Sequence, residues 1–404
     1  MPQTRSVSVA VFVAVGSRYE PDEMAGASHF VEHMLFKGTE RRPNAQDIAK
    51  TIEGVGGMMN ASTGRELTVY WTKVTPSHFP LALDLLIDML RHSLFDETET
   101  EKERSVIIEE INNTLDTPSE WVGDLVNALL WPNHPVGRDV AGTRESVSRL
   151  SRDALLNYQA SGYVPANAVV SIAGAIQYED AVKEVETFLG DWSGMPTCSA
   201  PPVTDATGGF RLKIGHKVTE QAHFCLGVRA LPRLHPDRFT LMVLNTILGE
   251  GMSSRLFVEI REKRGLAYDV GSYVNYMSDT GSLVIHAGVP VPKAPAAIEA
   301  CIQEMVRLKE ELVTPTELER AIEYAKGHLL LSLEDTLANA SWVGRQEVLD
   351  HEVLSVDDVV ARIQAVTAEE IHRVATTLFT TEALRLAVVG PFEDEAPFYA
   401  VLGL

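Results

Sequence analysis

The sequence has no long apolar run, few cysteines and a shortage of positive charge, and each absence excludes a class of protein. No stretch approaches the ~18 apolar residues of a membrane-spanning helix, so we expect no membrane insertion. The three cysteines, Cys198, Cys225 and Cys301, are odd in number and widely spaced, which excludes a disulfide framework and a cysteine-based zinc site. A reducing cytoplasm is the compartment that fits this cysteine usage.

Acidic residues outnumber basic ones, with 56 Asp and Glu against 35 Lys and Arg and a formal net charge of −21. Nucleic acids and anionic membranes bind basic patches, so we expect neither as a partner. The glycine-rich stretches have neither the P-loop nor the dinucleotide-binding spacing, which excludes those nucleotide sites. The remaining composition, 45% hydrophobic and 23% charged, is ordinary for a globular protein.

The chain has 404 residues, too many for one ordinary core, and it divides into two similar halves. Residues 193–209, SGMPTCSAPPVTDATGG, have no periodicity and predict a linker between a first half, 1–192, and a second half, 210–404. Each half opens with an apolar strand, a turn-rich segment and an apolar helix, and each closes with an apolar strand that runs into glycine. These strands are residues 6–16 and 167–175, and residues 222–228 and 383–391. The repetition predicts duplicated α+β units.

The pentapeptide HFVEH at residues 29–33 lies in the apolar helix of the first half. Residues four apart share a helix face, about 5–6 Å apart at Cβ, so His29 and His33 can bind one ion. Zinc accepts imidazole nitrogens, and catalytic zinc sites leave one position for water. Glu32 is placed to act on that water as a general base, in the order known as the inverzincin signature. The alternative is a helix with two incidental histidines, and the matching helix 239–248 has none.

Two histidines need a third protein ligand, and the acidic segment 96–115 offers three candidates. Its acidic first turn and helical periodicity predict a helix that carries Glu103, Glu109 and Glu110. Glu103 and Glu110 are nearly two turns apart and share a face, whereas Glu109 lies about 120° away from it. The spacing therefore favours Glu110 as the ligand with Glu103 in support. The alternative is a solvated acidic face.

The pentapeptide, followed 77 positions after His33 by Glu110 in ERSVIIEEI, resembles the pitrilysin/insulinase family, most closely its mitochondrial-processing-peptidase-like branch. The resemblance covers essentially the whole chain. It implies that His29, His33 and Glu110 bind zinc, that Glu32 is the general base and that Glu103 assists. It also implies an α+β fold of two homologous halves, each a mostly antiparallel sheet with helices packed on it, that enclose a chamber.

Residues 56–63, which lead into the strand at 66–74, resemble the substrate-binding edge strand of the same family. The resemblance implies that Asn60, Ala61, Ser62 and Thr63 bind the substrate. An edge strand can pair its free main-chain groups with an extended peptide. The alternative is a glycine-rich hairpin between core strands.

Residues 249–268 resemble the second-half segment of the family whose arginine and tyrosine, seven positions apart, approach the site. These residues are Arg261 and Tyr268, and the resemblance implies that they stabilise negative charge that develops on the scissile carbonyl. The alternative is a surface arginine near a helix end at Gly265 and a tyrosine in a strand.

Together these features predict a cytoplasmic zinc metalloendopeptidase that hydrolyses extended or unstructured peptides with one zinc ion per chain. The resemblance implies a dimer, because shorter members of this family commonly dimerise, and since the chain carries both the zinc motif and the Arg261/Tyr268 segment we expect a homodimer. The alternative is a non-catalytic peptide-binding or partner subunit of a processing-peptidase-like complex, but such relatives typically lose the zinc residues that this chain retains. Family members usually have another strand before residues 5–8, so we expect the first sheet to lack one strand.

Overall fold

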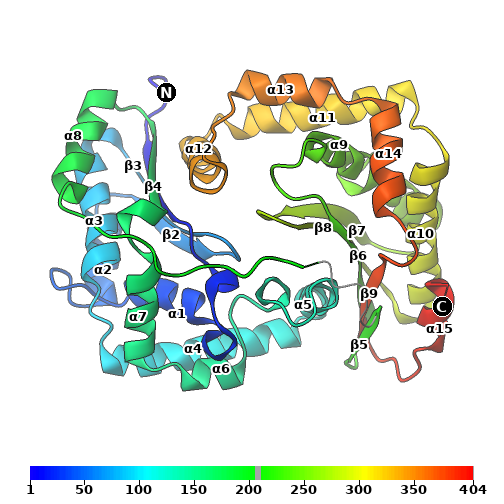
Figure 1. The fold of residues 1–404 in the computed structure, drawn as a ribbon, viewed down its shortest axis with the longest axis horizontal. Helices are drawn as coiled ribbons and strands as arrows, with labels where there is room; N and C mark the ends of the chain where they lie inside the picture. The colour runs from blue at the N-terminus through cyan, green and yellow to red at the C-terminus, as the bar shows by residue number, and fades with distance from the viewer. Residues whose placement is uncertain (205–210, 404) are drawn as a thin grey trace. The chain divides into compact units, whose positions relative to one another are not determined.

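The computed structural model describes residues 1–204 and 211–403, which form two compact units. The first unit consists of residues 1–112, 138–201 and 331–354, and the second of residues 113–137, 202–330 and 355–404. Each unit is one β-sheet with helices packed on it (Figure 1), which confirms the predicted α+β class. Among the described helices, none combines the length and apolar character needed to cross a bilayer.

The sheet of the first unit has four antiparallel strands in the order β2-β3-β1-β4. Their bounds are Val7–Val13 for β1, Met58–Thr63 for β2, Thr68–Val74 for β3 and Ala168–Gly174 for β4. The helices of this unit are α1 (Ala27–Leu35), α2 (Ala45–Glu53), α3 (Phe79–His92), α4 (Glu97–Asp116), α6 (Arg144–Arg149), α7 (Arg152–Gly162), α8 (Tyr178–Leu189) and α12 (Thr336–Asp350).

Strand β1 is buried along its whole length because it faces two cores. Side chains alternate between the faces of a strand, so Val9 and Val11 join the core under α1, α3 and α7, whereas Phe12 joins a second core under α12. Helix α12 approaches β1 closely at Gly344, where an added Cβ would lie 2.1 Å from the ring of Phe12. Glycine is therefore required at this contact.

The sheet of the second unit has five strands in the order β5-β9-β6-β8-β7, and only β5 and β9 are parallel. Their bounds are Leu212–His216 for β5, Gln221–Ala230 for β6, Asp269–Tyr276 for β7, Gly281–Pro290 for β8 and Arg385–Gly390 for β9. The helices are α5 (Pro118–Leu130), α9 (Arg238–Gly249), α10 (Ala294–Glu310), α11 (Pro315–Ser332), α13 (Val356–Gln364), α14 (Ala368–Leu378) and α15 (Ala396–Val401). Helices α9, α10 and α14 contact this sheet, as does α5.

The compact units differ from the predicted halves, 1–192 and 210–404, because each unit contains one helix from the other half of the sequence. Helix α5 precedes the linker but packs on β5, β6 and β9, where its Val126 and Leu130 join the core that contains Val284. Helix α12 follows the linker but packs on β1 and β4. Residues 193–204 of the predicted linker form neither helix nor strand, and residues 205–209 lie outside the described residues.

Residues 356–378 form two helices in the structure, α13 and α14. Thr367 begins α14 with a capping box: its hydroxyl oxygen accepts from the backbone N–H of Glu370 at 3.2 Å, and the Glu370 carboxylate accepts from the backbone N–H of Thr367 at 3.0 Å. This reciprocal cap satisfies the first amides of a new helix. The apolar periodicity continues across the break and conceals it.

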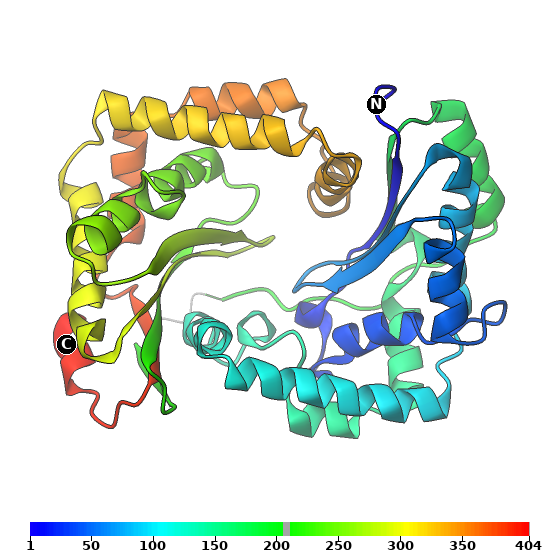
Figure 2. The same ribbon diagram turned by 180° about the vertical axis from the view of Figure 1, so that it is seen from behind.

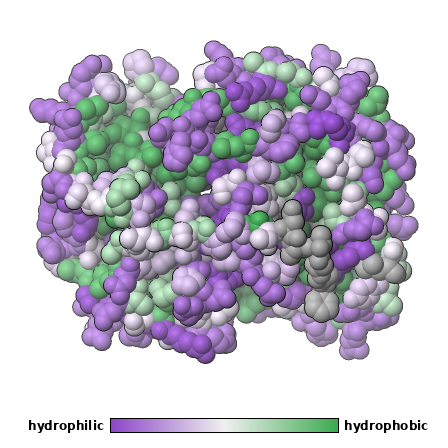
Figure 3. All heavy atoms as spheres, viewed as in Figure 1, coloured by the Kyte–Doolittle hydropathy of each residue, from purple (hydrophilic) through white to green (hydrophobic). Residues whose placement is uncertain are grey.

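Among the described residues, the first sheet has no counterpart of β5. In the second unit β5 lies beside β9, and the following Lys217 donates its N–H to the carbonyl oxygen of Gly390 at 3.0 Å. In the first unit the amino group of Met1 donates to the carbonyl oxygen of Gly174 at 3.0 Å, and no described strand lies beyond β4. Apolar residues of β4 and α8 are consequently only half-buried, and Figure 3 shows apolar side chains at the surface beside them.

Candidate metal centre

Helix α1 carries the pentapeptide on one side and the core on the other. Phe30, Val31 and Met34 are fully buried, whereas His29 and His33 are half-buried on the side that faces α4. The helix spans Ala27–Leu35, in agreement with the predicted apolar helix. Helix α4 runs beside α1, as Figures 1 and 2 both show. This arrangement brings the acidic residues of α4 to the histidines.

Three predicted ligand atoms converge between α1 and α4. Nε2 of His29 lies 3.1 Å from Nε2 of His33, and Oε2 of Glu110 lies 3.8 and 3.6 Å from these nitrogens. Ligand atoms around a tetrahedral zinc ion with bonds of ~2.0–2.1 Å lie about 3.3 Å apart. Within the described residues this is the one group of three such side chains close enough to hold a metal ion. The residues therefore fit zinc, while Glu109 is exposed on another side of α4.

The ring nitrogens of the two histidines are also arranged to suit a cation. Burial, followed by the charge of the neighbouring His33, lowers the pKa of His29 to about 4, so His29 is neutral at pH 7. Nδ1 of His33 lies 2.9 Å from Oε1 of Glu103. When the N–H of Nδ1 donates to this carboxylate, Nε2 of His33 has a free lone pair. The two Nε2 atoms thus face each other, an arrangement that a cation bound between them stabilises. Nδ1 of His29 is buried and has no partner among the described residues.

Glu103 holds His33 in place and is itself held by Lys37. It lies on α4, is 5% exposed and accepts from His33 through Oε1 and from Lys37 Nζ through Oε2 at 2.6 Å. Burial alone would raise the pKa of Glu103, but the hydrogen bonds from His33 and Lys37 outweigh it and lower that pKa. Outer contacts of this kind fix the orientation of a metal-binding histidine. Lys37 was not predicted, although its position four residues after His33 is the signal that points to it.

Glu32, which lies between the two histidines in the sequence, contacts the end of β2. Its carboxylate accepts from the hydroxyl of Thr63 through Oε2 and also from the Thr63 backbone N–H. Burial is the largest influence on the pKa of Glu32 and raises it, while the hydrogen bonds from Thr63 oppose the increase. Thr63 was predicted as a substrate-binding residue, and in the structure its hydroxyl is engaged by Glu32.

Strand β2, which contains the predicted substrate-binding residues, is an edge strand of the first sheet. It pairs with β3 in an antiparallel ladder, with Asn60 opposite Trp71 and Ala61 opposite Tyr70. Asn60 and Ser62 are exposed, and the backbone N–H of Ala61 bonds the side-chain oxygen of Asn60 at 2.8 Å. The alternative of a hairpin buried between core strands is therefore wrong, because one edge of β2 has no described strand beside it.

Arg261 and Tyr268 lie together in the second unit. Arg261 belongs to a π-helical turn, Phe257–Lys263, and its guanidinium lies over the Tyr268 ring at 4.5 Å and donates to the Tyr268 carbonyl oxygen at 2.9 Å. Gly265, at φ +56°, ends this turn. Tyr268 precedes β7 and is 76% exposed, so it is not a core residue. Short π-helical segments are frequent at functional sites.

Glu20 supports the start of α1. The N-cap residue Gly26, at φ +94°, has no side chain to bond the first amides of the helix. Instead the buried carboxylate of Glu20 accepts from the backbone N–H of Gly26 at 2.9 Å and from that of Ser28 at 2.7 Å. Burial outweighs these hydrogen bonds and raises the pKa of Glu20 to about 7.

Glu20 should make the stability of the protein depend on pH. Between pH about 4.5 and 7 the unfolded chain ionises Glu20 while the folded protein keeps it protonated, so its contribution to the unfolding free energy falls as pH rises and is lost above pH 7. The loss amounts to about 3 kcal/mol. The unfolding free energy of the chelated protein, measured with denaturant from pH 5 to 8, should therefore decline less in Glu20→Gln than in the wild type. Glu53→Gln, at an exposed position on α2, is the control, and equal slopes in Glu20→Gln and the wild type would contradict the expectation.

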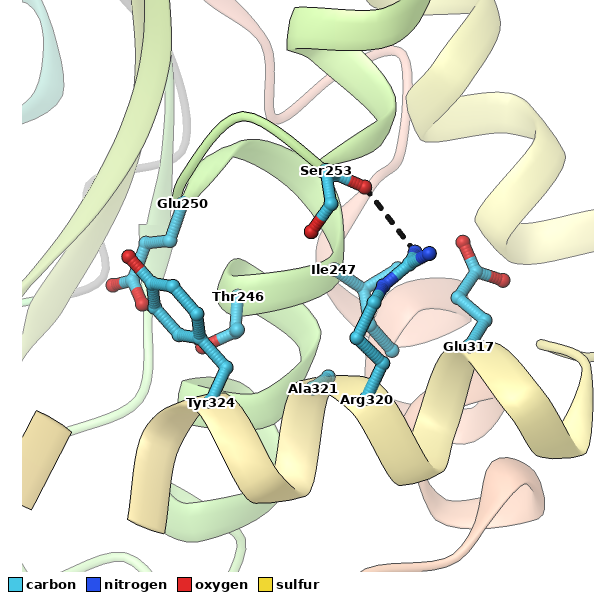
Figure 4. Close-up of a pocket in the computed structure, with 8 residues that line it drawn as sticks. All are labelled: Thr246, Ile247, Glu250, Ser253, Glu317, Arg320, Ala321 and Tyr324. Carbon is cyan, nitrogen blue, oxygen red and sulfur yellow. Dashed lines mark hydrogen bonds between the residues drawn. The ribbon is translucent and has the colours of Figure 1, made fainter. Parts of the chain in front are cut away.

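Helices α9 and α11 of the second unit correspond, by their place in the order of elements, to α1 and α4 of the first. Figure 4 shows a small pocket between them. Arg320 donates to the carbonyl oxygen of Ser253 at 3.2 Å, and the Glu250 carboxylate accepts from Asn245 at 2.7 Å and Thr246 at 2.9 Å. The residues that line the pocket include no histidine. In the second unit, side-chain hydrogen bonds therefore occupy the position that the metal-binding residues have in the first.

Known proteins resemble this chain along most of its length. Residues 1–144 match the family model described as insulinase (peptidase family M16), and residues 149–324 match that described as peptidase M16 inactive domain. The chain is 38% identical over 392 residues to a Bacillus subtilis (strain 168) protein named "Uncharacterized zinc protease YmxG", covering 96% of this chain and 94% of that protein. It is 37% identical over 401 residues to a protein of Streptomyces coelicolor named "Uncharacterized zinc protease SCO5738", covering 98% of this chain and 87% of that protein.

Solved structures share the fold. A protease from Helicobacter pylori superposes with a TM-score of 0.91 at 23% identity, covering 96% of this chain and 94% of that one. A Pseudomonas fluorescens structure described as peptidase M16 inactive domain superposes with a TM-score of 0.89 at 17% identity, covering 97% and 94%. With both family models matched and relatives of more than 30% identity along nearly its full length, the chain belongs to the insulinase family of peptidases, family M16.

Proposed function

We propose that this protein is a zinc metalloendopeptidase that hydrolyses extended or unstructured peptides. The observation that carries the proposal is the convergence of His29, His33 and Glu110 beside Glu32, with an edge strand next to them. The names of the relatives support zinc as the metal. One zinc ion per chain would be held by the two histidines and Glu110.

Bound there, zinc supplies a Lewis acid that polarises the peptide carbonyl and makes a water molecule more acidic. Glu32 accepts the proton of the attacking water and returns it to the leaving amine. Its raised pKa, caused first by burial, brings this carboxylate closer to the pH at which a general base works best. Glu103 and Lys37 keep the imidazole of His33 oriented, with Nε2 free to bind the metal.

Strand β2 is the proposed substrate platform. Main-chain pairing along its open edge selects an extended peptide conformation with little regard to side chains. Asn60, Ala61, Ser62 and Thr63 make up the end of this strand that adjoins Glu32, so a peptide paired there lies next to the base. A folded segment has no free main-chain groups for such pairing, which favours unstructured substrates.

Arg261 and Tyr268 are proposed catalytic residues that stabilise the negative charge on the scissile carbonyl. Tyr268→Phe should lower kcat/KM about 100-fold, as loss of such a donor does elsewhere. Zinc content and thermal stability should be unchanged, because the Tyr268 side chain is 76% exposed. Tyr178→Phe on α8, at 77% exposure, is the matched control. Full activity in Tyr268→Phe would remove the phenol from the mechanism.

We further propose a cytoplasmic homodimer of the processing-peptidase-like type, without nucleic-acid or membrane partners. One chain carries the zinc residues as well as Arg261 and Tyr268, so no different subunit is needed to supply either set. The net charge of −21 disfavours anionic partners. Sedimentation of the purified protein would test the dimer.

The test of the proposed function is hydrolysis of a pool of unstructured, fluorescence-quenched peptides. Cleavage should disappear on chelation and return when zinc is added. Protein that contains zinc and cleaves none of the pool would favour the second candidate, a non-catalytic peptide-binding or partner subunit. The intact set of His29, Glu32, His33 and Glu110 argues against that candidate, since a binding subunit has no need of a base beside its metal ligands.

A further inference from the structure

Thr63 joins the edge strand β2 to the side chain of Glu32. Its hydroxyl donates to Oε2 of Glu32, and its backbone N–H bonds the same carboxylate. Glu32 belongs to α1, so without these bonds its carboxylate would be held only by its own flexible side chain. Two hydrogen bonds from one residue of a different element fix both the position and the rotation of a carboxylate.

The backbone around Thr63 is held in place by hydrogen bonds. Thr63 pairs with Thr68 at the last position of the β2–β3 ladder, and the next residue, Gly64, donates its N–H to the carbonyl oxygen of Leu67 at 2.7 Å, which closes a tight turn. The carbonyl oxygen of Gly64 also accepts the N–H of Ser17 at 3.1 Å. A β-branched side chain has few χ1 positions available. The hydroxyl of Thr63 is thus fixed by its backbone and cannot easily turn elsewhere.

The contact also fixes where the open edge of β2 ends. Main-chain groups of a strand point to the same side at every second residue. The N–H of Thr63 points to Glu32, so the N–H groups of Ala61 and Met59 point to the same, open side. The N–H of Ala61 agrees, because it bonds the side-chain oxygen of Asn60 at 2.8 Å and takes no strand partner there. The N–H groups on the open side therefore run from Met59 to Ala61, where the Asn60 side chain accepts from Ala61, and the next one, that of Thr63, faces the base.

We propose that Thr63 is a positioning residue for the general base Glu32, holding its carboxylate where the open pairing edge of β2 ends. This inference rests on the proposed function. The base that accepts the proton of the attacking water is thus positioned by the same strand that binds the peptide, so the strand aligns the base with the peptide. The hydroxyl of Thr63 contributes to the chemical step and little to peptide affinity.

The test compares Thr63→Val, which keeps the shape and removes the hydroxyl, with Thr63→Ser, which restores it. In Thr63→Val, kcat should fall about 10- to 100-fold, the range expected for loss of a hydrogen bond to a charged group. KM should change less than about twofold and zinc content should be unchanged, since uniform binding is not altered. Thr63→Ser should recover most of kcat. Retention of kcat in Thr63→Val, or a Ser variant as slow as the Val variant, would overturn the proposal.

The matched control is Thr72→Val on β3. It makes the same chemical change in the adjacent strand, at a hydroxyl that is buried and has no hydrogen-bond partner among the described residues. Its activity and stability should match the wild type. A loss of kcat equal to that in Thr63→Val would mean that the sheet, and not the contact with Glu32, is responsible.

A second readout does not need turnover. Denaturant unfolding of the chelated wild type, Thr63→Val, Glu32→Ala and the double variant forms a double-mutant cycle. The effects of the two changes should not add, because each removes the same contact. Additive effects would overturn the inference even if the enzyme is active. Non-additive effects in a protein that shows no zinc-dependent hydrolysis would support the contact while removing the proposed function.

Discussion

Glu32→Gln should abolish peptide hydrolysis while the protein stays folded and binds zinc. Glutamine keeps the shape of the side chain and one acceptor for Thr63, but it cannot accept the proton of the attacking water. General-base catalysis contributes about 10²- to 10⁴-fold, and kcat should fall by this factor. The metal ligands are His29, His33 and Glu110, so zinc content should remain at the wild-type level.

The measurement is kcat on the quenched-peptide pool, together with zinc content by elemental analysis and thermal unfolding. Glu23→Gln is the control, because Glu23 is exposed in the same unit ahead of α1. Its turnover should equal that of the wild type. If Glu32→Gln turned over peptides at an unchanged rate, Glu32 would lose its role as base, and the peptidase mechanism would have to use another group.

Glu110→Gln should lose zinc, and Glu109→Gln should not. Oε2 of Glu110 lies within 3.8 Å of both Nε2 atoms, whereas Glu109 is exposed and accepts from Asn112 at 3.3 Å. Removal of an outer contact alone costs 10- to 100-fold in metal affinity. Loss of the charged ligand itself should therefore weaken zinc binding by more than about 100-fold.

The adjacent pair makes a strict comparison, since both variants remove one negative charge from the same helix turn. Competition with a fluorescent chelator would give the two zinc affinities directly. Activity should follow zinc occupancy in Glu110→Gln and be retained in Glu109→Gln. The opposite result would mean that Glu109, and not Glu110, is the metal ligand on α4.

The parts of the site that follow from helical periodicity could be predicted from the sequence. His29 and His33 share one face of α1 because they are four residues apart, and Glu103 and Glu110 share one face of α4 because they are seven apart. The structure brings these two faces together. Local spacing was sufficient for each pair, since each lies within one helix, but only the family resemblance implied that the two helices meet.

Contacts between elements distant in the sequence could not be derived in this way. No periodicity links Thr63 with Glu32, and Lys37 meets Glu103 only because α1 and α4 lie side by side. The same limit applies to the fold. Helix α5 has an amphipathic pattern that demands an apolar surface, but the pattern does not say which sheet provides it. The compact units consequently differ from the halves that the linker divides.

The position of α12 affects how the protein is made on the ribosome. The sheet of the first unit has all its strands once Gly174 is synthesised, but α12, which covers β1 and β4, ends at Asp350. At a translation rate of about 5–20 residues per second, roughly 10–35 s separate the two. During this interval Phe12 and Val69, which are buried against α12 in the finished protein, remain open to water. Nascent chains of this protein are therefore expected to be substrates for the chaperones that bind apolar segments during translation.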